Sequence, residues 1–342
     1  MNLSSPVYSI AGIPLAELKK IFREADLPAY QAVCVFRGIH RDGIFELEKI
    51  PEIGRKTRQF LESQPFLQPL TLLQKQESSD GTIKLSWQVA SGDVIESVII
   101  PNEEGRVTLC VSSQAGCAVG CPFCLTSYMG LKKNLTSAEI VLQYLQSRPF
   151  SPRLIKNIVF MGMGEPLHNE QEVLQACRTF IDDFGSGLGK RKVAVSTSGV
   201  ASKIETFWNA DICNIALSLH ATTDEVRNQL VPLNKKWNLK ALQETFQKLH
   251  YKNREKIMIE YVLLHEVNDT PEDAVRLLEW CQGFPSKINL IHFNSFPQAP
   301  YRASAPDRIV RFREVLLSAG LFHTFRTPRG RDVSAACGQL AY

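Results

Sequence analysis

The spacing of apolar residues divides the chain into three stretches. From residue 1 to about 65 the apolar side chains recur every three or four positions, as in 13–22, which is the period of a helix. Residues 82–89 instead alternate apolar and polar side chains after a Ser-Asp-Gly turn, and a second turn leads into 94–100. The pattern predicts a small helical module over 1–65, a β-meander linker over 66–105 and a core domain over 106–342.

In the third stretch, short apolar runs and amphipathic segments alternate. The runs predict strands at 107–111, 158–161, 193–196, 215–219, 257–263, 288–293 and 322–326. The intervening segments predict helices at 172–183, 240–249, 274–282 and 308–317, and Thr136 with Glu139 forms the signature of a capping box that opens another. This alternation predicts an α/β fold with parallel strands and right-handed crossovers. About six such units are too few for a closed eight-stranded barrel, so we expect a partial (β/α)6 barrel with its active residues at the carboxyl ends of the strands.

Within the helical module, residues 47–56 resemble a helix, a tight glycine turn and a second helix. A hairpin of this kind can offer backbone amides and basic side chains to a nucleic-acid backbone. A plain helix–helix turn accounts for the same sequence equally well.

Composition and charge restrict the class of protein only loosely. Apolar residues make up 44% and charged residues 22% of the chain, as in ordinary globular enzymes. No apolar run approaches the roughly 18 residues of a membrane span, and the N-terminus lacks the pattern of a signal peptide. We therefore expect a cytoplasmic protein with no membrane partner. The net charge is +4, and five basic clusters make an RNA partner plausible, although each also fits a solvated surface.

The cysteines indicate where the chemistry lies. Four of the nine fall between 110 and 124, and three of them form a C-x3-C-x2-C motif of Cys117, Cys121 and Cys124 directly after the first core strand. Three thiolates can bind three irons of a cubane cluster and leave the fourth iron without a protein ligand. A structural zinc site needs four ligands, and no matching fourth Cys or His follows. The motif therefore predicts an iron–sulfur site with one open iron.

Three further groups of small or polar residues follow predicted strands. Residues 162–166 read Gly-Met-Gly-Glu-Pro, where glycine lets the backbone approach a ligand and the carboxylate can bind an ammonium group. Residues 196–199 and 218–221 add hydroxyls and an imidazole, and Asn294 follows a later strand. Such groups suit a ligand with a ribose and a carboxylate. Taken singly, a turn or a capping role explains each group about as well.

Together these segments resemble the radical-SAM adenine-methylating enzymes of the RlmN/Cfr family across nearly the whole chain. The resemblance rests on 109–117, 162–166, 218–221 and 335–340. It implies a radical-SAM barrel, a [4Fe–4S] cluster, and S-adenosylmethionine (SAM) as both methyl donor and radical source. The implied substrate is an adenine in RNA.

The resemblance also implies roles for individual residues. Cys337 would take a methyl group from SAM and carry it, and Cys110 would release the product by forming a transient disulfide with Cys337. Glu96 would be the proton acceptor, although its spacing from Cys110 is one residue longer than usual. The SAM contacts would be Gly164, Glu165, Ser196, Ser218, Leu219, His220 and Asn294. The remaining cysteines, Cys34, Cys177, Cys213 and Cys281, fit packing positions.

For the reaction, the family implies methylation at C2 of an adenine in 23S rRNA and in tRNA next to the anticodon. It implies an electron donor such as flavodoxin or ferredoxin, and we expect a monomer. Methylation at C8 is the nearest alternative, and a radical-SAM activase acting on a protein or a non-enzymatic metal-containing RNA-binding module are alternatives of other classes. The sequence departs from the family in 125–134, after the cluster motif, and in its short segment beyond Cys337.

Overall fold

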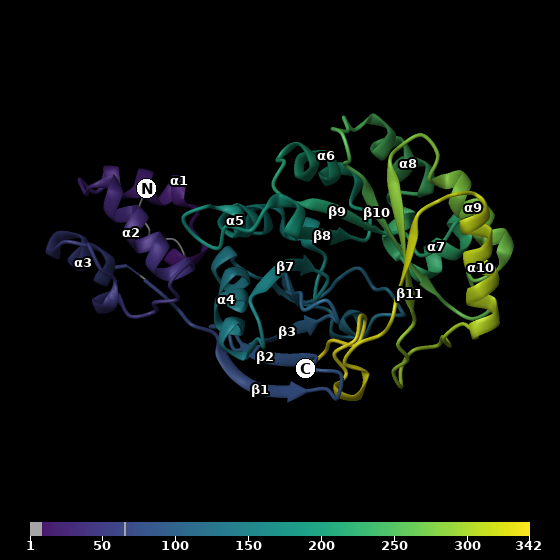
Figure 1. The fold of residues 1–342 in the computed structure, drawn as a ribbon, viewed down its shortest axis with the longest axis horizontal. Helices are drawn as coiled ribbons and strands as arrows, with labels where there is room; N and C mark the ends of the chain where they lie inside the picture. The colour runs from purple at the N-terminus through teal and green to yellow at the C-terminus, as the bar shows by residue number, and fades with distance from the viewer. Residues whose placement is uncertain (1–8, 65) are drawn as a thin grey trace.

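The computed structural model describes residues 9–64 and 66–342, so the start and the last residue of the predicted 1–65 module lie outside the described residues. Its centre is a ten-stranded sheet, and its helices lie along the sheet and at its ends (Figure 1). In spatial order the strands are β1 (Thr71–Glu77), β2 (Ile83–Gln88), β3 (Val94–Pro101), β4 (Val107–Cys110), β7 (Ile155–Phe160), β8 (Val193–Thr197), β9 (Asn214–Ser218), β10 (Ile257–Leu263), β11 (Ser286–His292) and β12 (His323–Arg326).

The seven strands from β4 to β12 run parallel, each paired with the next along the chain. The sheet begins at β1 and ends at β12 without these two strands pairing, so it is an open, partial barrel, as the sequence predicts. Because the strands are parallel, their carboxyl ends share one rim. Seven predicted strands correspond to β4, β7, β8, β9, β10, β11 and β12.

Helices connect the parallel strands. They are α4 (Ser137–Ser147), α5 (Glu170–Ile181), α6 (Ala201–Asn209), α7 (Asp224–Leu230), α8 (Leu239–Lys248), α9 (Pro271–Trp280) and α10 (Pro306–Ser318). The predicted capping box is confirmed at α4, where the Thr136 hydroxyl accepts from the Glu139 amide at 3.2 Å and Glu139 accepts from the Thr136 amide at 2.8 Å. A two-stranded ribbon of β5 (Gln114–Gly116) and β6 (Leu131–Asn134) flanks the cysteine motif.

The predicted meander is an extension of the main sheet. Strands β1, β2 and β3 pair antiparallel, and β3 continues antiparallel onto β4 with Val98 opposite Cys110. The C-terminal segment lies against the same strands, because Asp332 accepts from the Ser78 hydroxyl at 2.6 Å (Figure 1). The division of the chain into three parts remains a prediction.

The N-terminal module contains α1 (Leu15–Glu24), α2 (Ala29–His40) and α3 (Arg55–Glu62), and it lies at one end of the molecule (Figure 1). The helix expected from residue 47 is wrong, since only a 3-10 turn forms there (Leu47–Lys49). Pro51 follows almost at once, and Glu52 has a φ of 63°, so the chain turns instead of continuing a helix. The module packs closely on α4, where Gly12 leaves no room for a Cβ beside the Ala138 backbone.

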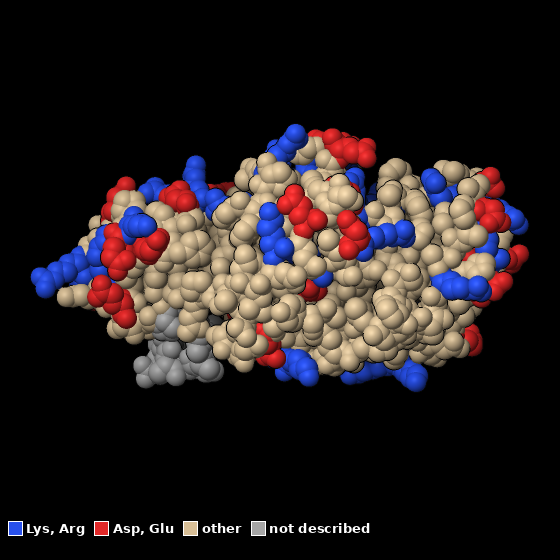
Figure 2. Space-filling view, turned by 90° about the horizontal axis from the view of Figure 1, so that it is seen from below, with Lys and Arg blue, Asp and Glu red and all other residues tan. Residues whose placement is uncertain are grey.

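Charge is dispersed on the face that Figure 2 displays. Lysine, arginine, aspartate and glutamate side chains surround a broad uncharged area and form no single basic field there (Figure 2). Within the described residues, no helix has the length and apolar character of a membrane span.

The buried His40 at the end of α2 makes stability depend on pH. Burial, with a smaller contribution from Arg148, lowers the pKa of His40 to about 3, and neither ring nitrogen has a hydrogen-bond partner. The unfolded chain binds this proton below about pH 6.5 and the folded chain does not, so stability falls as the pH drops from about 6.5 towards 3. His40→Phe should remove about 1.4 kcal/mol per pH unit of this loss. Urea unfolding of the metal-free protein between pH 6.5 and 5 measures it, and parallel curves for variant and wild type would contradict the assignment.

Candidate active site

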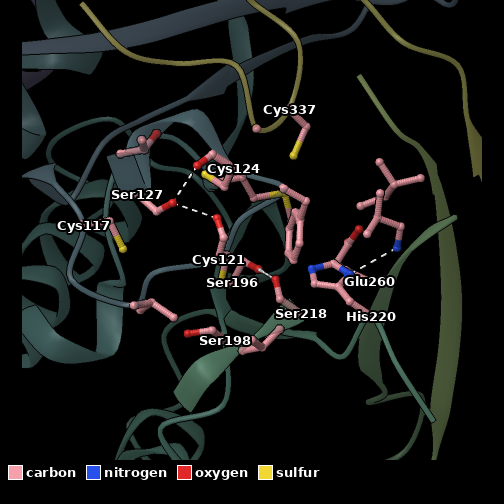
Figure 3. Close-up of a pocket in the computed structure, with 18 of the residues that line it drawn as sticks. Cys117, Cys121, Cys124, Ser127, Ser196, Ser198, Ser218, His220, Glu260 and Cys337 are labelled. Carbon is pink, nitrogen blue, oxygen red and sulfur yellow. Dashed lines mark hydrogen bonds between the residues drawn. The ribbon is translucent and has the colours of Figure 1, made fainter. Parts of the chain in front are cut away.

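A cavity of about 150 Å³ opens at the carboxyl ends of the parallel strands (Figure 3). It brings together residues that are far apart in the sequence, from the cysteine motif after β4 to the C-terminal segment. Ten of the residues singled out in the sequence line it, namely Cys117, Cys121, Cys124, Gly164, Glu165, Ser196, Ser218, His220, Asn294 and Cys337.

The three motif cysteines lie on a loop, residues 117–124, that is held by its own backbone and by Ser127. The Ser127 hydroxyl contacts the carbonyl oxygens of Cys121 and Cys124 at 2.7 and 2.8 Å, and the Cys117 amide donates to the Gly130 carbonyl at 3.1 Å. These contacts fix the backbone and leave the three thiols free for another partner.

The donor set fits an iron–sulfur cubane. Burial raises the pKa of Cys117 to about 12, and it also holds the pKa of Cys121 and Cys124 above the usual range. Buried thiols of this kind become thiolates when a bound cation compensates their charge. Among the described residues, no three His, Cys, Asp or Glu side chains converge on a point that could hold a single metal ion. A cubane differs from such a site because each thiolate binds a separate iron, so its ligands surround a space.

Glu165 offers a fixed carboxylate to the cavity. One oxygen accepts from the Ser198 amide at 2.7 Å and from its hydroxyl at 2.5 Å, and the other accepts from the Leu167 amide at 3.0 Å. The backbone before it needs glycine, because Gly164 has a φ of 102° and lies against Gln114. The carboxylate is thus held in place and has capacity left for an ammonium group.

The ends of β8 and β9 contribute hydroxyls and an imidazole. The Ser196 and Ser218 hydroxyls lie 3.3 Å apart, and His220 Nδ1 accepts from the Val262 amide at 3.1 Å. Burial, with a smaller effect of Arg227, lowers the pKa of His220 to about 3, so the ring is neutral and its proton is on Nε2. Leu219 does not line the cavity, because its side chain is in the hydrophobic core and its amide donates to the Glu260 carbonyl.

A second cavity of about 370 Å³ adjoins the first and contains Cys110. Cys337 lines both cavities, and Figure 3 displays its side chain beside Cys124. Burial and the neighbouring Cys337 raise the pKa of Cys110 to about 12. Cys337 is open to the cavity but has protein on most sides, and this desolvation raises its pKa to about 11.

Hydrogen bonds hold the segment that carries Cys337 in this position. The Leu125 amide donates to the Gly338 carbonyl at 2.7 Å, and the Thr126 hydroxyl donates to the Leu340 carbonyl at 2.6 Å. The Asn294 side chain donates to the carbonyl of Cys337 itself at 3.2 Å. The C-terminal segment is therefore attached directly to the chain that follows Cys124.

Glu96 lies in β3 and lines neither cavity. One of its oxygens is 3.2 Å from the Lys84 ammonium and accepts from the Ser86 hydroxyl, while the other has no hydrogen-bond partner. It is a buried carboxylate on the strand opposite Cys110, and its proton-acceptor role remains a prediction.

Sequence reasoning missed two arginines at this rim. Arg326 ends β12 and lines the second cavity with Cys110 and Cys337, with its Nη1 3.5 Å from Met161 Sδ. Its position at the end of a predicted strand could have indicated it, because active residues gather there. Arg227 in α7 gave no such signal, since it is fully buried in the middle of a helix.

Arg227 ties the strand ends together. Its guanidinium donates to the carbonyl oxygens of Leu219 (2.9 Å), Ser198 (2.8 Å) and Ser218 (3.1 Å), and to the Asn234 side chain (2.9 Å). Burial lowers its pKa to about 10, which still leaves it charged at neutral pH. The loops after β8 and β9 therefore share one buried cation.

Comparisons with known proteins agree with this geometry. The profile of the Radical SAM superfamily matches residues 111–280. The dual-specificity RNA methyltransferase RlmN of Cereibacter sphaeroides is 41% identical, covering 97% of this chain and 89% of its own. The RlmN of Pseudomonas putida strain W619 is 40% identical, covering 99% and 91%. A crystal structure of a radical SAM methyltransferase from Sphaerobacter thermophilus superposes with a TM-score of 0.90 at 34% identity, covering 97% of this chain and 99% of its own.

Replacing Arg227 tests whether the strand ends depend on it. Arg227→Met should reduce the free energy of unfolding by about 3–5 kcal/mol, because it removes the shared donor of four buried or partly buried acceptors. Arg191→Met, at an exposed position, is the matched control and should stay within about 0.5 kcal/mol of the wild type. Denaturant unfolding measures both variants, and equal values would show that the buried cation is dispensable.

Proposed function

Because the chain belongs to the RlmN family of radical SAM RNA methyltransferases, we propose that it methylates C2 of an adenine in 23S rRNA and in tRNA next to the anticodon. The enzyme uses a [4Fe–4S] cluster and SAM. The observation that carries the proposal is the position of Cys337, which lines both the cavity of the cluster motif and the cavity of Cys110. A methyl carrier needs access to both.

In the first cavity, we assign Cys117, Cys121 and Cys124 to the cluster and the rest of the lining to SAM. When bound, the cluster supplies the electron for the reductive cleavage of SAM. Glu165 binds the ammonium group of SAM through its fixed carboxylate. The Ser196 and Ser218 hydroxyls and the Nε2 proton of His220 bind its ribose and carboxylate, and Asn294 lines the same cavity. Leu219 acts through its backbone alone, by fixing the chain before His220.

Cys337 carries the methyl group. An adenine C2 lies between two ring nitrogens and is a poor nucleophile, so direct transfer from a sulfonium is unfavourable. A thiolate attacks the same methyl readily: a new sulfur–carbon bond forms on Cys337, the sulfonium bond breaks, and S-adenosylhomocysteine leaves. Cleavage of a second SAM would remove one hydrogen atom from this methyl group as 5′-deoxyadenosine. The carbon would then bond to C2, whose hydrogen leaves as a proton while the unpaired electron returns to the cluster. The Cys110 thiolate then attacks the Cys337 sulfur, which forms a disulfide and releases the base. The two electrons of the broken sulfur–carbon bond stay with the product, which gains a proton at that carbon.

Glu96 is our candidate for the proton acceptor. Its free oxygen has no hydrogen-bond partner, whereas the other is committed to Lys84 and Ser86. We further propose that the enzyme works as a monomer in the cytoplasm with a flavodoxin- or ferredoxin-type donor.

Anaerobic turnover with methyl-labelled SAM and bulk RNA, followed by nucleoside analysis, tests the reaction. We expect label in 2-methyladenosine from both rRNA and tRNA. Label in 8-methyladenosine would overturn the assignment to C2, and label in no nucleoside would overturn the function.

The two cysteines should fail in different ways. Cys337→Ala should take up no methyl group and give no product, because the carrier thiol is gone. Cys110→Ala should accept the methyl group and then accumulate a covalent protein–RNA adduct, which appears as a shifted band on a denaturing gel. Cys281→Ala is the control, since Cys281 is buried and lines neither cavity. Methylation by Cys337→Ala, or absence of an adduct with Cys110→Ala, would contradict the scheme.

A further inference from the structure

The cluster loop reaches the protein surface on one side. Ala118 and Gly120 are exposed, although the thiols on either side of them line the first cavity. The C-terminal segment closes another side of this loop through the Leu125 and Thr126 hydrogen bonds. Electrons from outside therefore have a short path to the three cysteines through the exposed part of the loop.

Three segments contact the cluster loop and continue onto this surface. Gly130 and Leu131 pack against Gly116 at its start, where a Cβ has no room. The Tyr128 hydroxyl donates to the Pro122 carbonyl at 3.2 Å. Pro232 opens a 3-10 turn (Pro232–Lys235) and lies next to Gly120.

These segments expose apolar and basic side chains together. Tyr128 is 50% and Leu131 44% exposed. Lys132, Lys235 and Lys236 are also exposed, and in the part of the chain that the structure describes none of the three forms an ion pair. We call Gly120, Tyr128, Leu131, Lys132, Lys235 and Lys236 the cluster-side patch.

Asp224 lies beside the segment of Lys235 and Lys236, where its carboxylate accepts from the Asn234 side chain at 2.8 Å and from the Leu239 amide at 3.0 Å and forms no ion pair with either lysine. Glu139 pairs with Lys133, and Glu170 pairs with Lys203. Glu172 accepts from the Ser137 amide at 2.6 Å. The lysines of the patch thus keep their charge for a partner. The Lys236 ammonium also lies over the Trp237 ring, 4.5 Å from its centroid. Aromatic rings among exposed lysines without ion pairs are suited to an acidic protein, because apolar contact provides affinity and the charges steer the encounter.

We propose that the cluster-side patch docks the acidic protein that delivers electrons to the cluster. The proposal rests on the function above, in which the donor reduces the cluster by one electron before SAM is cleaved. RNA fits this surface less well, because its adenine has to reach Cys110 and Cys337, and no residue of the patch lines that second cavity. Donor and RNA then bind the enzyme at separate places.

Charge reversal of the patch tests the proposal. The variant Lys132→Glu/Lys235→Glu/Lys236→Glu should bind oxidised flavodoxin about tenfold more weakly or worse at low salt, as measured by calorimetry. Its turnover driven by flavodoxin should fall accordingly, while turnover driven by dithionite, a small reductant that needs no docking surface, should stay as in the wild type. Wild-type affinity should decrease as salt is added, because the charges are exposed.

The matched control reverses three exposed lysines away from the patch, Lys156→Glu/Lys192→Glu/Lys248→Glu, so that total charge is equal in both variants. Equal affinity of the patch variant and this control for flavodoxin would overturn the docking site. Loss of RNA binding together with dithionite-driven turnover in the patch variant would overturn it in favour of an RNA surface. Failure of the wild type under dithionite would overturn the proposed function, while the flavodoxin affinities would still decide the docking site.

Discussion

The contact between the C-terminal segment and the chain after Cys124 is the constraint on which the site depends. Two hydrogen bonds to main-chain carbonyls, from the Leu125 amide and the Thr126 hydroxyl, join parts of the protein that lie more than 200 residues apart in the sequence. The segment has little regular structure of its own, so these bonds and the Asn294 contact replace the support that a helix or strand would give. These hydrogen bonds hold Cys337 at the boundary between the cavity of the cluster motif and the cavity of Cys110.

The parallel sheet supplies the rest of the site, but its strand ends need further support. Loops after parallel strands carry backbone groups with no ladder partner. Arg227 satisfies three such carbonyls after β8 and β9, and Glu165 satisfies the Leu167 and Ser198 amides. The buried Arg227 guanidinium and the buried Glu165 carboxylate thus fix the neighbouring loops through their hydrogen bonds. Both are costly to desolvate, and their several hydrogen bonds offset that cost. The result is a lining whose polar groups are in place before a ligand arrives.

Local patterns in the sequence were sufficient to predict the parallel strands and most helices of the core domain and to identify the cysteine motif. The parallel strands are buried apolar runs, and the capping box of α4 depends on only four consecutive residues, Thr136 to Glu139. Predictions from the sequence failed where packing between distant segments determines the position of a side chain. Leu219 belongs to a matching motif, yet the chain leaves β9 at Ser218 and turns at His220, which has a φ of 60°. The Leu219 side chain therefore packs in the core, whereas Ser218 and His220 line the cavity. The turn at Leu47–Lys49 looked helical because its apolar spacing suits a single turn as well as a helix. Arg227 and the second cavity depend on contacts between distant segments, which no local pattern encodes.

In the proposed reaction, the charges around Cys337 also set the order of the steps. With a pKa of about 11, its thiol is protonated at neutral pH until positive charge enters the cavity. SAM carries that charge on its sulfonium, so the methyl donor itself favours the thiolate that attacks it. Cys110 is deeper, with a pKa of about 12. Arg326 and Arg329 both line the second cavity, and Arg326 lowers the pKa of both thiols. Two thiols that share a cation ionise one after the other, because the first thiolate raises the pKa of the second. In the proposed scheme, Cys110 then stays protonated while Cys337 takes the methyl group, and it ionises once the Cys337 sulfur has become a neutral thioether. In this scheme, the burial of the two thiols and their shared cation, Arg326, separate the loading of the methyl group on Cys337 from the release of the product by Cys110.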